Sequence, residues 1–207
     1  MGKYSDYNII PLGDHCATSL ILKELNIRQK SYPFDWNAST DLLYDTTIIT
    51  NVSFIDELNK TEIENIDEIL KKYIGDALDN KELINKNLKI TFPHDVGCKK
   101  ENYEKYKRRF IRLKEDLNKK NLFVILTRYY FIEKDIFEKI KENLLSYNNE
   151  SIILFISGKN HEYFDENHEN NENVIFKHIN YDISKFYQYD YTHFRPNIKK
   201  YLSEILL

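Results

Sequence analysis

Residues 122–126 read LFVIL and residues 152–156 read IILFI, and these two stretches decide the fold. Short, continuous apolar runs are typical of strands that are buried on both faces, as in a parallel sheet. Residues 9–12 (IIPL) supply a third run near the start of the chain. The sequence therefore predicts a sheet whose central strands include all three runs.

The stretches between these runs carry apolar residues at the spacing of a helix. Long helices are predicted at residues 63–73, 103–117 and 132–145, shorter ones at 41–50 and 199–207, and further strands at 88–92 and 174–179. Strands that alternate with long helices are typical of an α/β fold. We therefore expect a single α/β domain over residues 1–207, with a mostly parallel sheet flanked by helices in a Rossmann-like, three-layer arrangement.

The composition narrows the class of protein. A chain of 207 residues with 16 tyrosines and 12 phenylalanines can bury one sizeable core. No apolar run approaches the roughly 20 residues that cross a bilayer, and the first residues lack the apolar stretch of a signal peptide. The formal net charge of -3 argues against a chain built as a whole for nucleic acid. The two cysteines lie 82 positions apart, so the chain has no disulfide framework. We expect a cytoplasmic protein without a membrane or nucleic-acid partner.

No cofactor or metal is expected. The five glycines are too far apart to write either GxGxxG or GxxxxGK[ST], and no GxSxG motif is present. His94 and Cys98, together with His15 and Cys16, could supply four metal ligands. Their spacing matches none of the common zinc patterns, so we do not assign a metal site to them.

Cys16 follows the first apolar run at a strand–turn–helix junction. Ala17, Leu20, Ile21 and Leu25 share one face of the helix that is predicted to come next. A thiol at the positive end of a helix dipole can have its pKa lowered to roughly 3.5 to 7.5, which makes it a nucleophile near neutral pH. The alternative is that Cys16 only fills space, because cysteine is among the most buried residue types.

His94 and Asp95 follow the strand predicted at 88–92, which Pro93 ends. Because active sites of α/β folds lie beyond the carboxyl ends of the strands, we expect His94 and Cys16 at one edge of the sheet. His94 would be the general base, with Asp95 or Asp14 orienting its imidazole. Asp14 could instead cap the helix, His94 could only satisfy a loop carbonyl, and His193 is a second candidate for the base.

Arg109 and Arg112 lie three residues apart on one face of the helix predicted at 103–117, within a basic stretch. Such a pair can clamp a phosphate or carboxylate, although arginines are equally common in structural ion pairs. Two functions remain open. One is a cysteine-dependent hydrolase or acyl transferase, acting on a peptide or a small anionic molecule. The other is a non-catalytic module that binds an anion such as a nucleotide-sugar or phosphate.

Residues 31–36 (SYPFDW) close the first unit of the chain. Pro33 fixes its own φ and biases Tyr32 toward an extended conformation, so we expect a rigid loop rather than a helix. Phe34 and Trp36 would return to the core and leave Asp35 pointing the other way. The carboxylate would then lie beside the Cys16 turn or against a basic residue such as Arg28.

The chain resembles a family of uncharacterised proteins described as papain-like cysteine peptidases. The resemblance rests on residues 12–16 (LGDHC), 31–36 (SYPFDW), the pair His94-Asp95 and the helix through Arg109 and Arg112. It implies that Cys16 is the nucleophile and His94 the base, with Asp35 and Trp36 in the wall of the site. It also implies a helical lobe that faces an antiparallel sheet, whereas the apolar runs predict a parallel one.

Overall fold

The computed structural model describes residues 3–13, 16–39, 47–75, 84–95, 99–128, 130–164, 173–185, 188 and 190–207. Its main sheet contains β1 (Asn8–Pro11), β5 (Asn121–Thr127), β6 (Ile152–Ser157) and β7 (Val174–His178). These strands lie in the order β1-β5-β6-β7, and each neighbouring pair is parallel. The three predicted runs therefore belong to one parallel sheet, and the predicted α/β class is confirmed. Pro11, which has no N–H to donate, is tolerated because β1 is an edge strand.

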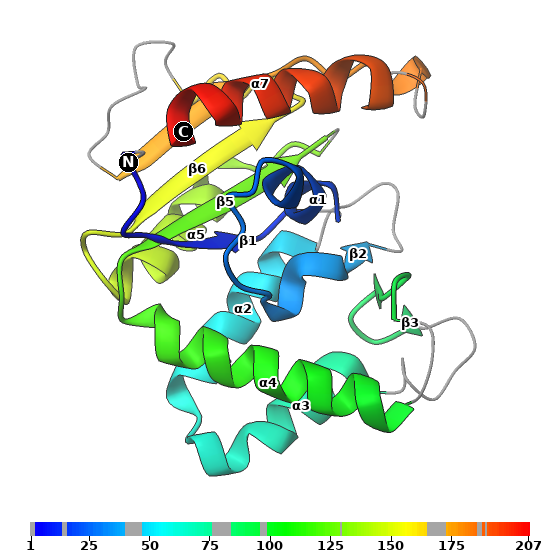
Figure 1. Ribbon diagram of the computed structural model, residues 1–207, viewed down its shortest axis with the longest axis vertical. Coiled ribbons are helices and arrows are strands. Elements are labelled where there is room, and N and C mark those ends of the chain that lie inside the picture. Colours follow the sequence, from blue (N-terminus) through cyan, green and yellow to red (C-terminus); the bar gives the residue numbers. More distant parts are fainter. Residues whose placement is uncertain are drawn as a thin grey trace.

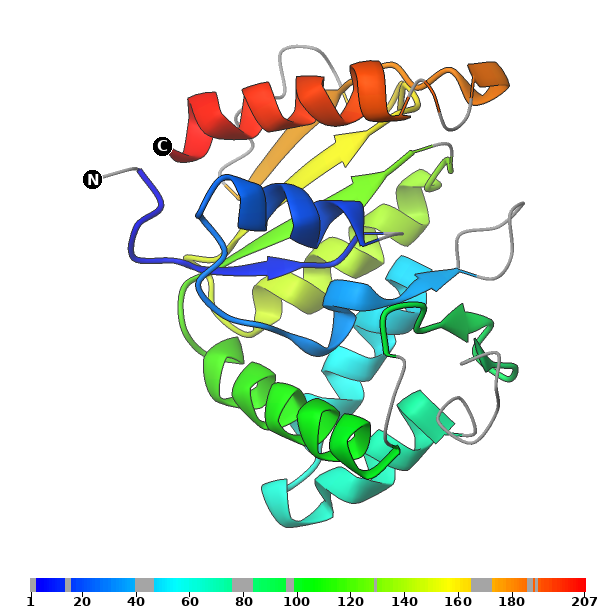
Figure 2. The same cartoon turned by 45° about the vertical axis from the view of Figure 1, so that its right-hand side comes forward.

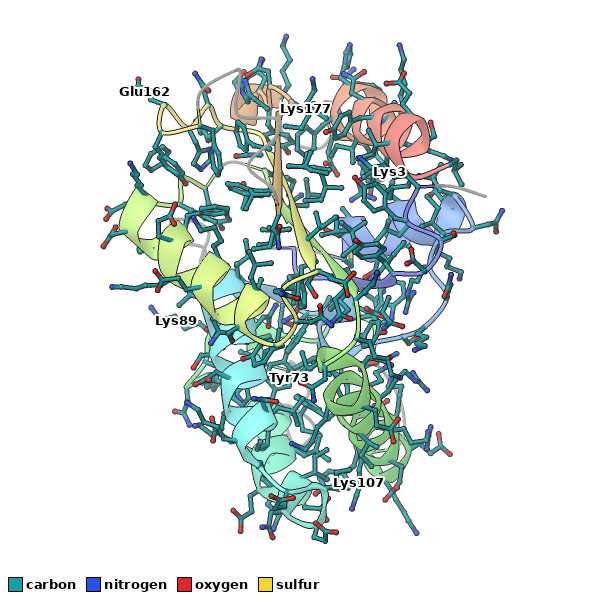
Figure 3. The ribbon with its side chains drawn as sticks, turned by 90° about the vertical axis from the view of Figure 1, so that its left-hand side faces the viewer. Lys3, Tyr73, Lys89, Lys107, Glu162 and Lys177 are labelled. Atoms are coloured by element: carbon teal, nitrogen blue, oxygen red, sulfur yellow. The ribbon has the colours of Figure 1, made fainter. Side chains whose placement is uncertain are left out.

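Helices cover both faces of this sheet and make three layers. The helices α1 (Ala17–Glu24) and α7 (Arg195–Leu206) lie on one face, and α5 (Lys134–Ser146) lies on the other (Figure 1; Figure 3). Every residue of β5 is buried. Leu122 and Val124 join the apolar cluster beneath α1 and α7, whereas Phe123 and Ile125 join the cluster that contains α5. A strand enclosed in this way must be apolar throughout, which explains the continuous run.

A second group of helices lies between β1 and β5 in the chain. It consists of α2 (Thr47–Lys60), a 3-10 turn η2 (Ile63–Asn65), α3 (Ile66–Ile74) and α4 (Lys99–Leu117). The side chain of Tyr73 in α3 is fully buried and packs against Phe54 of α2 and Phe110 of α4, while Lys107 of α4 forms an ion pair with Asp67 of α3 (Figure 3). Gly75 ends α3 with a φ of 36°, in the region that favours glycine. The helix predicted at 63–73 is therefore confirmed, as is the long helix predicted at 103–117.

The other predicted helices are confirmed with shifted bounds. The helix predicted at 132–145 is α5, and the terminal helix begins at Arg195 rather than at residue 199. Pro196 at its start suits the first turn of a helix, where a missing N–H costs nothing. A 3-10 turn η4 (Ile183–Lys185) and a π-helical turn η5 (Asp190–Phe194) lead from β7 into α7. Residues 41–46 of the helix predicted at 41–50 lie outside the described residues, and α2 begins at Thr47.

The strand predicted at 88–92 does not belong to the parallel sheet. Its two paired residues form β4 (Ile90–Thr91), which lies between β2 (Ala38–Ser39) and β3 (Ile84–Asn85) in a small antiparallel sheet. Ile90 and Phe92 are buried, whereas Thr91 between them is only half-buried. This alternation is typical of antiparallel strands with one covered face. The prediction that His94 follows a strand of the main sheet is therefore wrong.

Two further expectations need correction. Residues Pro33–Trp36 form a 3-10 helix, η1, rather than a loop without helical structure. The main sheet is parallel, so the architecture implied by the resemblance, a helical lobe facing an antiparallel sheet, does not describe this chain. In the described part of the chain, none of the helices combines the length and the apolar character needed to cross a membrane.

Candidate functional site

The connections that leave β1 and β5 run to opposite faces of the main sheet. The chain leaving β1 enters α1, on the same face as α7, whereas the chain leaving β5 enters α5 on the other face (Figure 2). In open parallel sheets, ligands bind in the crevice where neighbouring connections diverge beyond the carboxyl ends of the strands. The candidate site is therefore the carboxyl edge between β1 and β5, where Cys16 follows β1 and Arg128 follows β5.

Two glycines let the chain segments at this edge approach one another closely. A Cβ at Gly13 would overlap the hydroxyl of Thr18 and would lie 3.1 Å from the carbonyl oxygen of Leu126 in β5. A Cβ at Gly158, just after β6, would overlap the carbonyl oxygen of Arg128. Neither position leaves room for a side chain. The end of β5 is therefore in close contact with Gly13 at Leu126 and with Gly158 at Arg128.

Cys16 is the N-cap residue of α1, with φ -58° and ψ -10°, and its side chain is buried. Burial raises the pKa of its thiol above the ordinary value, since a thiolate is poorly solvated there. The positive charges of Arg195 and Arg128 oppose that rise, and the negative charge of Asp190 adds to it. The net direction is opposite to the lowered pKa that the sequence predicted, so the thiol is protonated at neutral pH in this state.

Arg195 and Asp190 form an ion pair close to Cys16. The Nε–H of Arg195 donates to Oδ2 of Asp190 over 2.7 Å, and Asp190 is 3% exposed. Both residues come from the segment that joins η5 to α7, which starts at the same edge of the sheet (Figure 1). Neither was identified from the sequence. Arg128 could have been identified, because it directly follows the buried run that forms β5, just as Gly13 follows the run at 9–12.

His193 belongs to the same segment but is exposed, and its Nδ1 lies 2.7 Å from the hydroxyl of Thr192. His94 is also exposed, and its ring lies 5.0 Å from that of Trp36, which in turn lies 5.3 Å from the guanidinium of Arg28. Neither histidine is among the charged groups that shift the pKa of Cys16 most strongly. Those groups are Arg195, Arg128 and Asp190.

Asp35 lies against Arg28, the second of its two predicted locations. The two side chains form an ion pair, and Oδ2 of Asp35 also accepts the N–H of Tyr32 over 3.1 Å. Asp35 is 1% exposed, and burial raises its pKa to about 6 although Arg28 and Arg109 oppose the rise. The carboxylate thus caps η1 and fixes the residues that carry Trp36 and Phe34. Trp36 is only half-buried, whereas Phe34 is in the core.

Asp95 points toward α4. Its carboxylate accepts hydrogen bonds from the hydroxyl of Tyr106 and the ammonium group of Lys105, and its carbonyl accepts the side-chain N–H of Asn102 over 2.8 Å. These contacts fasten the end of β4 to α4. The proposed role of Asp95 in orienting His94 stays a prediction. The role of Asp14 stays one too, because Asp14 lies outside the described residues, as do His15 and Cys98.

Arg109 and Arg112 make different contacts. Arg112 donates to the carbonyl of Ser31 over 2.6 Å. Arg109 is 9% exposed, lies 5.3 Å from the ring of Tyr106 and acts on Asp35 through its charge. Among the described residues, Nη1 of Arg109 has no hydrogen-bond partner. The anion clamp that the sequence predicted from this pair stays a prediction.

Comparison with known proteins identifies the family. A family model described as "Putative papain-like cysteine peptidase (DUF1796)" matches residues 7–153. The matched range holds Cys16, Asp35, Trp36, His94 and Arg128, and it ends before Asp190 and Arg195. Searches of curated proteins and of solved structures returned no match. Because the model covers well over half of the chain, the chain belongs to the family that carries this description.

Proposed function

We propose that the protein is a cysteine-dependent hydrolase or acyl transferase in which Cys16 is the nucleophile. The observation that carries the proposal is the location of Cys16, at the start of α1 and within reach of the charges of Arg195 and Arg128. Membership of a family described as cysteine peptidases supports it. The buried thiol is a resting state, and the two guanidinium groups compensate the negative charge once the proton leaves.

The reaction would proceed through a thioester. A base takes the thiol proton, the sulfur of Cys16 attacks the carbonyl carbon of the substrate, and the carbonyl oxygen becomes an anion. Backbone N–H groups in the first turn of α1 would stabilise that oxygen, because the N-terminal end of a helix carries a partial positive charge. The tetrahedral intermediate then releases an amine or alcohol, which takes the proton from the base. Water, or another acceptor, attacks the thioester and returns the thiol.

We propose His94 as the base. Of the six histidines, only His15 and His94 lie in the range that the family model matches. His161 is buried and both of its ring nitrogens are engaged, by the carbonyl of Lys159 and the N–H of Ile132. Burial lowers its pKa to about 4, so it is a poor general base near neutral pH.

The experiment is acyl transfer from a p-nitrophenyl ester or an alkyl thioester, followed by intact-mass spectrometry. Wild-type protein and the matched control Cys98→Ala should release product and carry one acyl group on Cys16. Cys16→Ala should do neither. His94→Gln should slow formation of the acyl-enzyme more at pH 6.5 than at pH 10, where a larger fraction of the thiol ionises without a base. Equal product release by Cys16→Ala and Cys98→Ala would exclude the nucleophile.

Binding of an anion without catalysis is the second candidate function. Arg109 favours it, because its Nη1 is buried without a hydrogen-bond partner among the described residues. An anion that reached this guanidinium would gain a charge-assisted hydrogen bond. Phosphate and a nucleotide-sugar can be titrated against thermal unfolding of Cys16→Ala and of Arg109→Gln. A rise in the melting temperature of the first variant only would support this function.

A further inference from the structure

A groove of about 290 Å³ lies between α1 and the start of α7. Its apolar walls are Leu20, Ile21 and Pro196, its charged walls are Glu24, Arg195 and Lys199, and Tyr191 stands at its rim. This volume is close to the lower end of the range in which proteins bind small ligands, roughly 300 Å³. Tyr191 is 60% exposed, and its ring lies 4.4 Å from the guanidinium of Arg195.

Two of the residues that line the groove, Arg195 and Leu20, connect it to Cys16. Arg195 lines the groove, and its charge lowers the pKa of the Cys16 thiol. Leu20 is one helical turn beyond Cys16, and its N–H donates to the carbonyl of Cys16 over 3.0 Å. Glu24 is eight residues beyond Cys16 on the same helix, which corresponds to about 12 Å at 1.5 Å per residue. The groove therefore runs along α1 and away from the thiol.

The far end of the groove carries a positive charge that can turn toward a ligand. Nζ of Lys199 lies 3.0 Å from a carboxylate oxygen of Glu24, and the two side chains are 44% and 58% exposed. Exposed ion pairs contribute little to stability, so Lys199 can exchange this partner for another at small cost. Near the thiol, Asp190 accepts the Nε–H of Arg195, and the guanidinium has four further N–H groups.

We propose that this groove binds the acyl part of the substrate, and that the acyl part is an apolar chain of about 10 to 12 Å ending in a carboxylate. The chain would lie on Leu20, Ile21 and Pro196, and its carboxylate would contact Lys199. This inference rests on the proposed function, because it names the substrate class of the Cys16 site. An anion is favoured over a cation because the exposed Lys199–Glu24 pair can open and present the ammonium group to the ligand, while Asp190 engages only the Nε–H of Arg195.

The test uses iodoacetyl probes in a Cys98→Ala background, so that Cys16 is the only cysteine. N-iodoacetyl-6-aminohexanoate carries a reactive carbon, a five-carbon chain and a carboxylate. Two matched probes end in a neutral methylamide and in a trimethylammonium group. Each labelling rate is measured by intact mass and divided by the rate of the same probe with 2-mercaptoethanol. The carboxylate probe should saturate and should label Cys16 about tenfold faster than the methylamide at low concentration. The cationic probe should be the slowest.

Variants and a shorter probe locate the carboxylate contact. Lys199→Gln should remove most of the preference for the carboxylate, whereas Lys200→Gln, its exposed neighbour on α7, should keep it. N-iodoacetylglycine, which is too short to reach Lys199, should react at the same rate with both variants. A short probe that depends on Lys199 as strongly as the long one would contradict the proposed course of the groove.

The outcomes separate this inference from the proposed function. Equal normalised rates for the three long probes, with Cys16 still labelled by iodoacetamide, would overturn the groove proposal and leave the nucleophile in place. Failure of iodoacetamide to label Cys16 in the folded protein, with labelling in urea, would remove both.

Discussion

The guanidinium of Arg28 forms an ion pair with the carboxylate of Asp35, seven residues further along the chain, and both side chains are almost completely buried. Arg28 also lies 5.3 Å from the ring of Trp36. The pair fixes η1 against the turn that follows α1. Because the ring of His94 contacts that of Trp36 edge-on, the same pair supports the residue that we propose as the base.

Replacing Arg28 by glutamine should destabilise the protein more at pH 8 than at pH 5. The pKa of Asp35 in the folded protein, about 6, is above its ordinary value of 3.8. The stability associated with this carboxyl group is therefore fully present below pH 3.8 and is lost as the pH rises through 6. Without Arg28, that pKa rises further and the loss at pH 8 grows.

Urea unfolding at the two pH values measures the difference. We expect Arg28→Gln to cost about 3 to 5 kcal/mol at pH 8, the usual cost of leaving a buried charge without its partner. Lys72→Gln is the matched control, because the Lys72–Glu57 pair is exposed, and it should cost less than about 1 kcal/mol at either pH. An equal loss at pH 5 and pH 8 would mean that Asp35 does not titrate in this range.

The two aromatic residues of η1 should differ in their contribution to stability. Phe34 is 3% exposed and packs edge-on against Tyr73 and Phe110. Phe34→Ala should therefore cost about 3 to 5 kcal/mol. Trp36 is half-buried and contacts Arg28 and His94, so Trp36→Ala should cost less than Phe34→Ala in the same urea titration. The reverse order would show that the indole ring, rather than the phenyl ring, fastens this segment.

The central strands could be predicted because burial on both faces requires apolar residues throughout 122–126 of β5 and 153–156 of β6. The location of β4 was predicted wrongly, although a short signal pointed to the antiparallel sheet that it joins. This error led to the expectation that His94 and Cys16 lie at one edge. The alternation of buried Ile90 and Phe92 with half-buried Thr91 was the signal that favoured an antiparallel sheet.

The candidate site was predictable only in part. Cys16 stands at a recognisable strand–turn–helix junction, and Arg28 was named as one of two partners for Asp35. Asp190 and Arg195 are far from Cys16 in sequence, and nothing in their local pattern points to the thiol. The direction of the pKa shift of Cys16 could not be predicted from the sequence either. A helix N-terminus contributes roughly 0.3 to 1 kcal/mol at an exposed site, whereas desolvation of a buried group can exceed that several times over.

His161 should make the stability of the protein depend on pH. The pKa of this buried imidazole is lowered from 6.5 to about 4. Its contribution is therefore fully present above pH 6.5 and is lost as the pH falls toward 4, by up to about 3 kcal/mol. Asp35 acts in the opposite direction over part of this range, so the wild-type curve alone does not isolate His161.

The difference between wild type and His161→Gln isolates this imidazole. Its Nε2 accepts the N–H of Ile132 and its Nδ1 bonds to the carbonyl of Lys159, so the ring joins the segments that follow β5 and β6. The wild type should be more stable than the variant at pH 7.5, and this advantage should shrink at pH 4.5. An advantage that is constant over this range would mean that the imidazole keeps its ordinary pKa.

Replacing Arg195 by glutamine should make Cys16 less reactive. Arg195 is the first of the charged groups that lower the pKa of this buried thiol, so its loss should raise that pKa further. At any pH below the pKa, the thiolate fraction falls as the pKa rises, and the rate of alkylation falls with it. Quenched labelling with iodoacetamide from pH 6.5 to 10, in the Cys98→Ala background, gives the alkylation rate of Cys16 as a function of pH for each variant. The inflection should move to higher pH in Arg195→Gln and stay in place in Lys200→Gln.

Asp190 provides the opposite change at the same position. Its carboxylate raises the pKa of Cys16 and accepts the Nε–H of Arg195. Asp190→Asn should keep a hydrogen-bond acceptor for Arg195 but remove the negative charge, which should lower the pKa of the thiol and speed alkylation near neutral pH. Circular dichroism spectra and urea midpoints of the variants show whether each is folded under the labelling conditions. If Arg195→Gln and Asp190→Asn shift the profile in the same direction, the reactivity of Cys16 is governed by access to the buried thiol rather than by these charges.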